Sequence, residues 1–439
     1  MLGAALLVAS GLGIQWLRLI DAYAVNVFVS DQWDFWTPMF REESFLAKFT
    51  YQHGTHTMGA GYLVIDWVGR LSDWHVPTEA VVLVLLTGMN AGLALWLKFR
   101  LVGRWHAWDV LIPLMILSYR HYAVFLVASN PSLNVVPLSL VLGTALCWTG
   151  KVPKVKYGGL AVLNVLALYT GYTFFSTVVI LILLVAEIAA RRRVHPVGWP
   201  AAALAVTVIP LGIFIAGFNR ASAAYGVTLF ESSLPEHIEF LARLWGNIFL
   251  VRGLVAAYAV LVLLLAAQGV LLWWILKRLF ARLGDEPPDG AALSLAYLAG
   301  YSAVYTINCV VIRVGMGLVG AHASRYIMHQ VPLLLGLYIF LQLQPAMWKR
   351  IVVAGIGLLL AGSELAAYRV YGPEMTAISE AKAKWLEVYR RSGEVSQANR
   401  ESGFKVYPWD EAQPLIELKL DYMKAHGLGL FAVVPADEM

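Results

Sequence analysis

Charged residues are scarce in this chain. Asp, Glu, Lys and Arg make up 14% of its 439 residues, whereas a soluble domain usually carries about 25%. Hydrophobic residues make up 59%. This balance excludes an ordinary soluble protein and predicts an all-α polytopic membrane protein, because apolar helices satisfy their own backbone inside a bilayer. The basic residues lie in short clusters between apolar runs, which argues against a nucleic-acid-binding domain.

Cysteine is nearly absent as well. Cys147 and Cys309 each stand inside an apolar run, so the sequence offers neither a disulfide framework nor a cysteine metal site. Fixed-period repeats and low-complexity segments are absent from the sequence too. The first residues lack the basic n-region and the small-residue cleavage site of a signal peptide, so we expect a retained first helix.

Long apolar runs, in contrast, fill most of the chain. A helix needs about 20 apolar residues to cross the hydrocarbon core. This length predicts eleven membrane-spanning helices, at residues 4–28, 80–97, 108–128, 133–149, 157–171, 173–190, 198–217, 249–276, 290–312, 326–344 and 350–368. The run at 157–171 is short, which is compatible with a broken helix.

The short loops between these runs predict the orientation of the chain. Five basic clusters fall on one side when the spans alternate: Lys98, Arg100 and Arg104; Lys151, Lys154 and Lys156; Arg191, Arg192 and Arg193; Lys277, Arg278 and Arg282; Lys349 and Arg350. By the positive-inside rule this side is cytoplasmic. The prediction is a multi-pass inner-membrane protein with its N-terminus inside and its C-terminus outside.

The outer side then receives the longer segments, which are 29–79, 218–248, 313–325 and the tail 369–439. We predict a transmembrane domain at 1–368 and a small helical appendage formed by the tail. The sequence also predicts an amphipathic juxtamembrane helix at 59–71 and another helix that begins at Pro235. Within the tail we expect helices that end at Gly393 and Gly427.

Two acids stand three residues apart after the first apolar run. Asp31 and Asp34 lie in the stretch SDQWDFWTPMF. If this segment is helical, the spacing places both carboxylates on one face, where they can bind a divalent cation such as Mg²⁺ or Mn²⁺ or act as a general base. The neighbouring aromatic residues would exclude water. The plainer interpretation is a helix cap with an aromatic belt at the membrane surface.

Two further pairs of polar residues are predicted on the outer side. His53 and His56 have a spacing that metal ligands use, but the segment holds no clear third ligand, and exposed loop histidines are the alternative. Arg313 and Arg325 bracket a stretch of small residues at the outer ends of two spans. An arginine pair there suits a phosphate or pyrophosphate, whereas the alternative is helix packing with snorkelling arginines.

Some polar residues interrupt the apolar runs themselves. Arg120 and His121 are the clearest case, because ionisable groups at membrane depth are functional candidates. They either line a cavity within a broken helix or form a satisfied pair inside the membrane.

Three pieces of the sequence, taken in order, resemble a known family. They are D-x-W-D at 31–34, Q-H-x-x-H at 52–56, and R-x-G-x-G followed by A-x-x-S-R-Y within 313–326. Together they resemble bacterial integral-membrane glycosyltransferases of the GT-C superfamily. The tail segment YPWDEAQPLIELKLDYMKAHGLGLF at 407–431 is similar to the closing segment of the same group.

The resemblance implies a GT-C-like fold and a transferase that takes its sugar from a polyprenyl-phosphate donor at the outer face. Asp31 or Asp34 would deprotonate the hydroxyl of a glycan, lipid or protein acceptor, in a direct displacement that usually inverts the anomeric carbon. The residues expected to bind the donor phosphate or the substrate are Arg325, Arg313, His53, His56, Arg120 and Tyr326.

One motif departs from the family pattern. The second piece usually reads Q-H-N-E-H-R, whereas residues 52–57 here read QHGTHT. If the missing acid contributes to catalysis, this protein works without it, uses another acceptor, or is inactive. Two other functions are open: a transporter or flippase of a lipid-linked saccharide, for which inverted repeats are expected, and a scaffold whose tail binds a partner.

Overall fold

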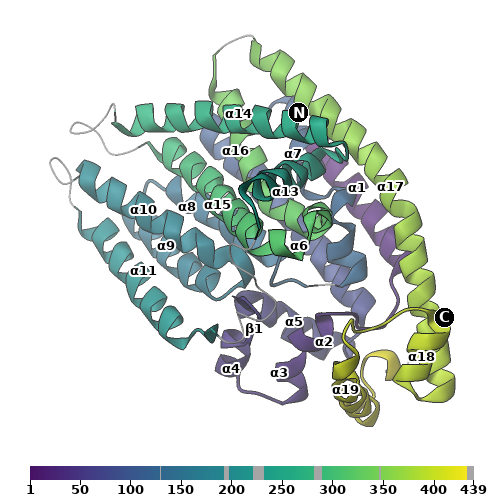
Figure 1. Ribbon diagram of the computed structural model, residues 1–439. Coiled ribbons are helices and arrows are strands. Elements are labelled where there is room, and N and C mark those ends of the chain that lie inside the picture. Colours follow the sequence, from purple (N-terminus) through teal and green to yellow (C-terminus); the bar gives the residue numbers. More distant parts are fainter. Residues whose placement is uncertain (129, 192–196, 221–231, 281–288, 346–347, 433–439) are drawn as a thin grey trace.

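The chain is almost entirely helical in the computed structural model (Figure 1). The structure describes residues 1–128, 130–191, 197–220, 232–280, 289–345 and 348–432. Arg192, Arg193 and Arg282 of the basic clusters lie outside the described residues, as does the stretch 221–231 of the second outer loop. The prediction of an all-α polytopic membrane protein is confirmed at this level.

Eight helical segments among the described residues are long and apolar enough to cross a membrane. They contain α1 (Leu2–Tyr23), α6 (Val76–Val102), α10 (Phe174–Arg191), α11 (Gly198–Gly217), α14 (Leu254–Phe280), α15 (Gly290–Arg313), α16 (Val331–Leu343) and α17 (Trp348–Ser392). Each coincides with one of the eleven predicted spans. In α16 the spanning segment includes the preceding 3₁₀ turn from Ser324.

The other three predicted spans are shorter or interrupted. α8 (Val135–Trp148) and α9 (Pro153–Leu168) have 14 and 16 residues, which gives lengths of about 21 and 24 Å at about 1.5 Å per residue. A hydrocarbon core is about 30 Å thick. The run at 108–128 contains α7 (Leu111–Ile116) and a π-helical turn, Ala123–Val127. The count of eleven therefore stays a prediction.

Short 3₁₀ turns join the longer helices at Ala107–Val110, Tyr119–His121, Gly171–Thr173, Asn247–Phe249, Val314–Met316, Leu318–His322, Ser324–Gln330, Asp410–Ala412 and Gly429–Phe431. Residues 29–79, which we call the first outer loop after their predicted side, fold into α2 (Gln32–Phe35), α3 (Thr37–Phe40), α4 (Phe45–Thr50), β1 (Gln52–His53), β2 (His56–Thr57) and α5 (Gly59–Ser72). α5 confirms the helix predicted at 59–71. α13 (Leu234–Gly246) begins one residue before Pro235 and carries a capping box of Ser233 and Glu236.

The basic loops and the first outer loop lie at opposite ends of the bundle. Arg100 donates to the carbonyl oxygen of Thr149 at 3.2 Å, and Gly290 lines the same surface as Arg100 and Lys151. From Gly290, α15 runs for 24 residues, about 36 Å at the usual helical rise, and ends at Arg313. Figure 1 shows α2–α5 and α19 gathered at one end of the bundle. Which end is cytoplasmic stays a prediction.

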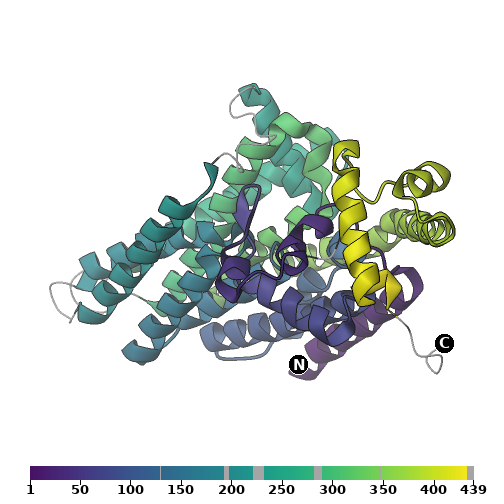
Figure 2. The ribbon, with the colours of Figure 1, turned by 90° about the horizontal axis from the view of Figure 1, so that it is seen from below.

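The tail is joined to the bundle without a break. α17 continues through residue 368, where the sequence predicted a domain boundary, and ends at Gly393, whose φ of 72° suits glycine. α18 (Val395–Ser402) and α19 (Gln413–His426) follow, and α19 ends at Gly427 as predicted. Figure 2 shows α19 alongside the first outer loop, and the two segments share one hydrophobic core.

Candidate functional site

One cavity of about 900 Å³ opens where the first outer loop, the connection before α16 and the tail meet. Seven of the eight residues that the sequence predicted for the site line it: Asp31, Asp34, His53, His56, Arg313, Arg325 and Tyr326. These residues come from segments more than 250 positions apart in the chain. Their roles stay predictions, but the fold brings them to one place.

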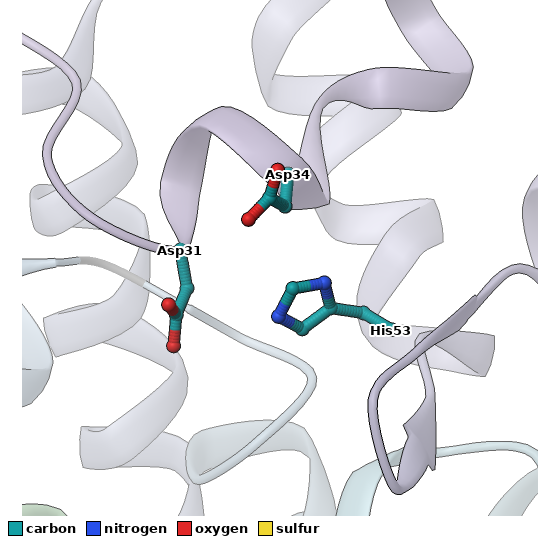
Figure 3. A group of neighbouring side chains, drawn as sticks. All are labelled: Asp31, Asp34 and His53. Atoms are coloured by element: carbon teal, nitrogen blue, oxygen red, sulfur yellow. The ribbon is translucent and has the colours of Figure 1, made fainter. Parts of the chain in front are cut away.

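The two acids share one turn of helix. Asp31 is the N-cap residue of α2, and its carbonyl oxygen accepts from the backbone N–H of Phe35 at 2.9 Å. Both carboxylates line the cavity. One oxygen of each and one ring nitrogen of His53 lie within 4.8 Å of one another (Figure 3). Trp33 and Phe35 are buried in the core that the loop shares with the tail. The aromatic cluster therefore anchors the helix that carries the acids.

A β-hairpin sets the two histidines side by side. His53 and His56 are directly paired across β1 and β2, with ring centroids 5.8 Å apart. Gly54 begins the two-residue turn with a φ of 57°, a conformation in which glycine is favoured. The side-chain amide of Gln52 donates to the carbonyl oxygens of Gly54 and Asn219 at 2.8 and 2.9 Å. Gly54, which stands where the motif that this segment resembles has Asn, thus supplies the turn residue of this hairpin.

The two histidines face different neighbours. His53 lies beside the acids, whereas the ring centroids of His56 and Tyr172 lie 5.2 Å apart. His56 is buried, and its burial lowers its pKa well below the usual range, with further lowering by His53, Arg313 and Arg325. At neutral pH His56 is therefore uncharged. Within the described part of the chain its Nε2 has no hydrogen-bond partner.

Two arginines also line the cavity. Arg313 donates to the hydroxyl oxygen of Tyr172 at 3.0 Å and lies 3.2 Å from the sulfur of Met316. The guanidinium of Arg325 lies 5.4 Å from the ring centroid of Tyr326. Among the described residues, neither arginine forms an ion pair with a carboxylate. Because arginine stays charged at physiological pH, the lining of the cavity carries two positive charges.

The tail completes the wall beside the acids. Tyr407, Pro408 and Trp409 line the cavity, and the hydroxyl of Tyr407 donates to Asp34 Oδ2 at 2.7 Å. Sequence analysis missed these residues as site residues. The only signal was the family likeness of the tail, which says nothing about where the tail packs.

Arg120 lies elsewhere. Its guanidinium is buried, donates to Ser118 Oγ at 2.6 Å and to the carbonyl oxygen of Ile248, and lies 3.8 Å from the carboxylate of Glu364 on α17. His121 is also buried, with its Nε2 3.1 Å from the carbonyl oxygen of Met115. The broken helix is present, but Arg120 lies in a buried polar network and does not line the candidate site. Among the described residues, His121 Nδ1 has no hydrogen-bond partner.

A divalent cation could be held by Asp31, Asp34 and His53. Their ligand atoms span up to 4.8 Å, while oxygen ligands of Mg²⁺ or Ca²⁺ lie about 2.0–2.6 Å from the ion, so small side-chain rotations would close the site. Asp34 is already engaged by Tyr407 and by Lys419, whose Nζ lies 3.9 Å from Oδ1. An Mg²⁺ or Mn²⁺ ion would have to compete with these donors.

Comparison with protein-family models and with curated proteins finds no match for the chain.

Proposed function

We propose that this protein is a GT-C type membrane glycosyltransferase that moves a sugar from a polyprenyl-phosphate donor to an acceptor hydroxyl at the outer face of the inner membrane. One observation supports this above the others. A single cavity is lined both by two carboxylates and by two arginines that form no ion pair with a carboxylate among the described residues. A base and an anion site are what a displacement of a phosphate leaving group needs.

The reaction would proceed in one displacement. The acceptor hydroxyl gives its proton to a carboxylate of the first outer loop as its oxygen attacks the anomeric carbon. The bond between that carbon and the phosphate oxygen breaks, and polyprenyl phosphate leaves with the electron pair. Arg313 and Arg325 stabilise the negative charge that develops on the phosphate. Attack from the face opposite the leaving group inverts the anomeric configuration.

The surroundings of the two acids support different roles for them. Among the described residues, the carboxylate of Asp31 accepts one weak hydrogen bond, from the hydroxyl of Ser30 to Oδ1 at 3.4 Å. Asp34 accepts a hydrogen bond from Tyr407 and faces the ammonium of Lys419. A base must be free to take up a proton, so we assign that role to Asp31. Asp34, which is held in place, would accept a hydrogen bond from the acceptor and orient it.

The test is a transfer assay with protein purified in liposomes and a polyprenyl-phosphate-linked sugar. Asp31→Asn should lower kcat roughly 10²–10⁴-fold, the usual contribution of a general base, while Asp34→Asn should mainly raise the KM for the acceptor. The control is Asp66→Asn, in the same loop but paired with Lys48 and Arg70 outside the cavity. Full activity in both the Asp31 and Asp34 variants would refute the proposal.

A further inference from the structure

Two side chains of the C-terminal tail contact Asp34 of the candidate site. We propose that Tyr407 and Lys419, which come from the C-terminal tail, are positioning residues that fix the carboxylate of Asp34 for acceptor binding. This inference rests on the proposed function, because it concerns how one acid of that site is oriented. It makes the tail part of the active site, where the sequence predicted a separate appendage.

The contact of Tyr407 is direct. Its hydroxyl donates to Asp34 Oδ2 at 2.7 Å, and a hydrogen bond to a carboxylate is about twice as strong as one between neutral groups. Tyr407 lies just after Val406, whose carbonyl oxygen accepts from the backbone N–H of Ser30 at 2.7 Å. This backbone bond fixes the tail beside the residue that precedes Asp31. The tyrosine therefore approaches Asp34 from a segment that is tied to the same loop.

Lys419 is the second tail residue beside Asp34. Its side chain is 4% exposed, and its Nζ donates to the carbonyl oxygen of Trp33 at 2.5 Å and to Thr37 Oγ1 at 3.0 Å. The same Nζ lies 3.9 Å from Asp34 Oδ1. Lysine is rarely buried to this degree without partners. Its three neighbours belong to α2 and the start of α3, so the ammonium ties α19 to the helix that carries both acids.

The shared core explains why these two side chains are held firmly. Trp33 and Trp36 of the loop and Val406, Ile416 and Leu420 of the tail belong to one hydrophobic cluster. Gly429 adds a backbone bond, because its N–H donates to the carbonyl oxygen of Asp73 at 2.6 Å. Burial of apolar surface on both segments fixes their relative placement. Loss of one hydroxyl should therefore leave the tail docked.

A double-mutant cycle tests the inference. Tyr407→Phe should raise the acceptor KM roughly tenfold, leave the donor KM and the melting temperature unchanged, and have no further effect in an Asp34→Asn background. Such non-additivity is the signature of a residue that acts through another. Tyr422→Phe is the matched control, since this tail hydroxyl bonds to Glu42 at 3.2 Å, outside the cavity. It should leave both KM values unchanged.

The outcomes separate the inference from the function on which it rests. Active wild-type protein with an unchanged acceptor KM in Tyr407→Phe would overturn the inference alone. An equal effect of Tyr407→Phe with and without Asp34 would also overturn it, because the tyrosine would then contact the substrate itself. Wild-type protein that transfers no sugar from any polyprenyl-phosphate donor would overturn the proposed function and the inference together.

Discussion

The arginines at two places in this protein have opposite surroundings. Arg120 lies in a closed network, where Ser118, Glu364 and the carbonyl oxygen of Ile248 surround its guanidinium. Arg313 and Arg325 face the large cavity, with tyrosine side chains as their close neighbours. Arg120 interrupts an apolar run, whereas Arg313 and Arg325 lie at the ends of two runs. The sequence offers a functional and a structural interpretation for both.

The difference teaches what separates a structural charge from one that can bind a ligand. Glu364 lies close enough to neutralise the charge of Arg120, and the carbonyl oxygen of Ile248 accepts one of its hydrogen bonds. The guanidinium groups of the cavity have no carboxylate partner among the described residues. An anion that enters the cavity would supply the missing charge. This contrast yields predictions that differ between activity and stability.

Within this comparison of arginines, the largest expected effect is at those that line the cavity. Arg325→Ala should lower kcat/KM for the polyprenyl-phosphate sugar roughly 10²–10³-fold, the usual effect of removing one group that stabilises transition-state charge. The melting temperature should stay close to that of the wild type, because Arg325 forms no ion pair within the described part of the chain. Steady-state kinetics and thermal unfolding of the same preparation check both statements. A large fall in melting temperature would show that Arg325 is structural.

Substitution of Arg120 should have the opposite result, with a loss of stability and little change in activity. Arg120→Met should lower the free energy of unfolding by about 3–5 kcal/mol, because the carboxylate of Glu364 stays buried without its partner. Transfer activity per folded molecule should change little. The double variant Arg120→Met with Glu364→Gln should be more stable than Arg120→Met alone. Normal stability together with lost donor binding would place Arg120 in the substrate site after all.

A conservative change sharpens the comparison further. Arg325→Lys keeps the charge but loses the planar fork that matches phosphate, so we expect a fall of roughly tenfold in kcat/KM. Donor titration of the purified variant measures it. An effect as large as that of Arg325→Ala would mean that the planar shape of the guanidinium matters at this position and that its positive charge alone does not.

The smallest expected effect is a pH dependence that arises from Lys419. Burial lowers the pKa of its amine to about 8, with Asp34 opposing the shift and Arg41 adding to it. As pH rises through 8 the ammonium loses its proton, so Asp34 loses its cation, and acceptor KM should rise a few-fold. Stability should rise over the same range, because the unfolded lysine holds its proton to about pH 10.4.

Lys419→Arg provides the control for this pH effect, since a guanidinium stays charged across the range. The variant should lose the alkaline rise in acceptor KM. An identical pH profile in the wild type and in Lys419→Arg would show that another group titrates.

Much of the fold could be predicted from the sequence, because hydrophobic length and helix-stop residues are local signals. The eight long apolar helices, α5, and the ends of α17 and α19 at Gly393 and Gly427 all follow from such signals. The prediction of eleven spans does not follow from these local signals alone. α8 and α9 are too short by length alone, and the break at Ser118 depends on Glu364, a residue 246 positions away.

The candidate site was predictable only in part. Motif spacing brought forward Asp31, His53 and Arg325, which line one cavity. The spacing of the two histidines suggested that both bind one metal ion. In the hairpin, however, His53 lies beside the acids and His56 beside Tyr172. Tyr407 and Lys419 could not be found, because no local pattern reveals that the tail shares a core with the first loop. Long-range packing of this kind is invisible to periodicity.

The most direct measurement is the fate of the lipid carrier. Purified protein in liposomes is given a polyprenyl-phosphate-linked sugar and a hydroxyl acceptor, and the lipid products are identified by mass spectrometry. The account predicts free polyprenyl phosphate in equal amount to the glycosylated acceptor, and neither product with Asp31→Asn. Intact lipid-linked sugar that merely reaches the opposite leaflet would contradict it and identify a transporter.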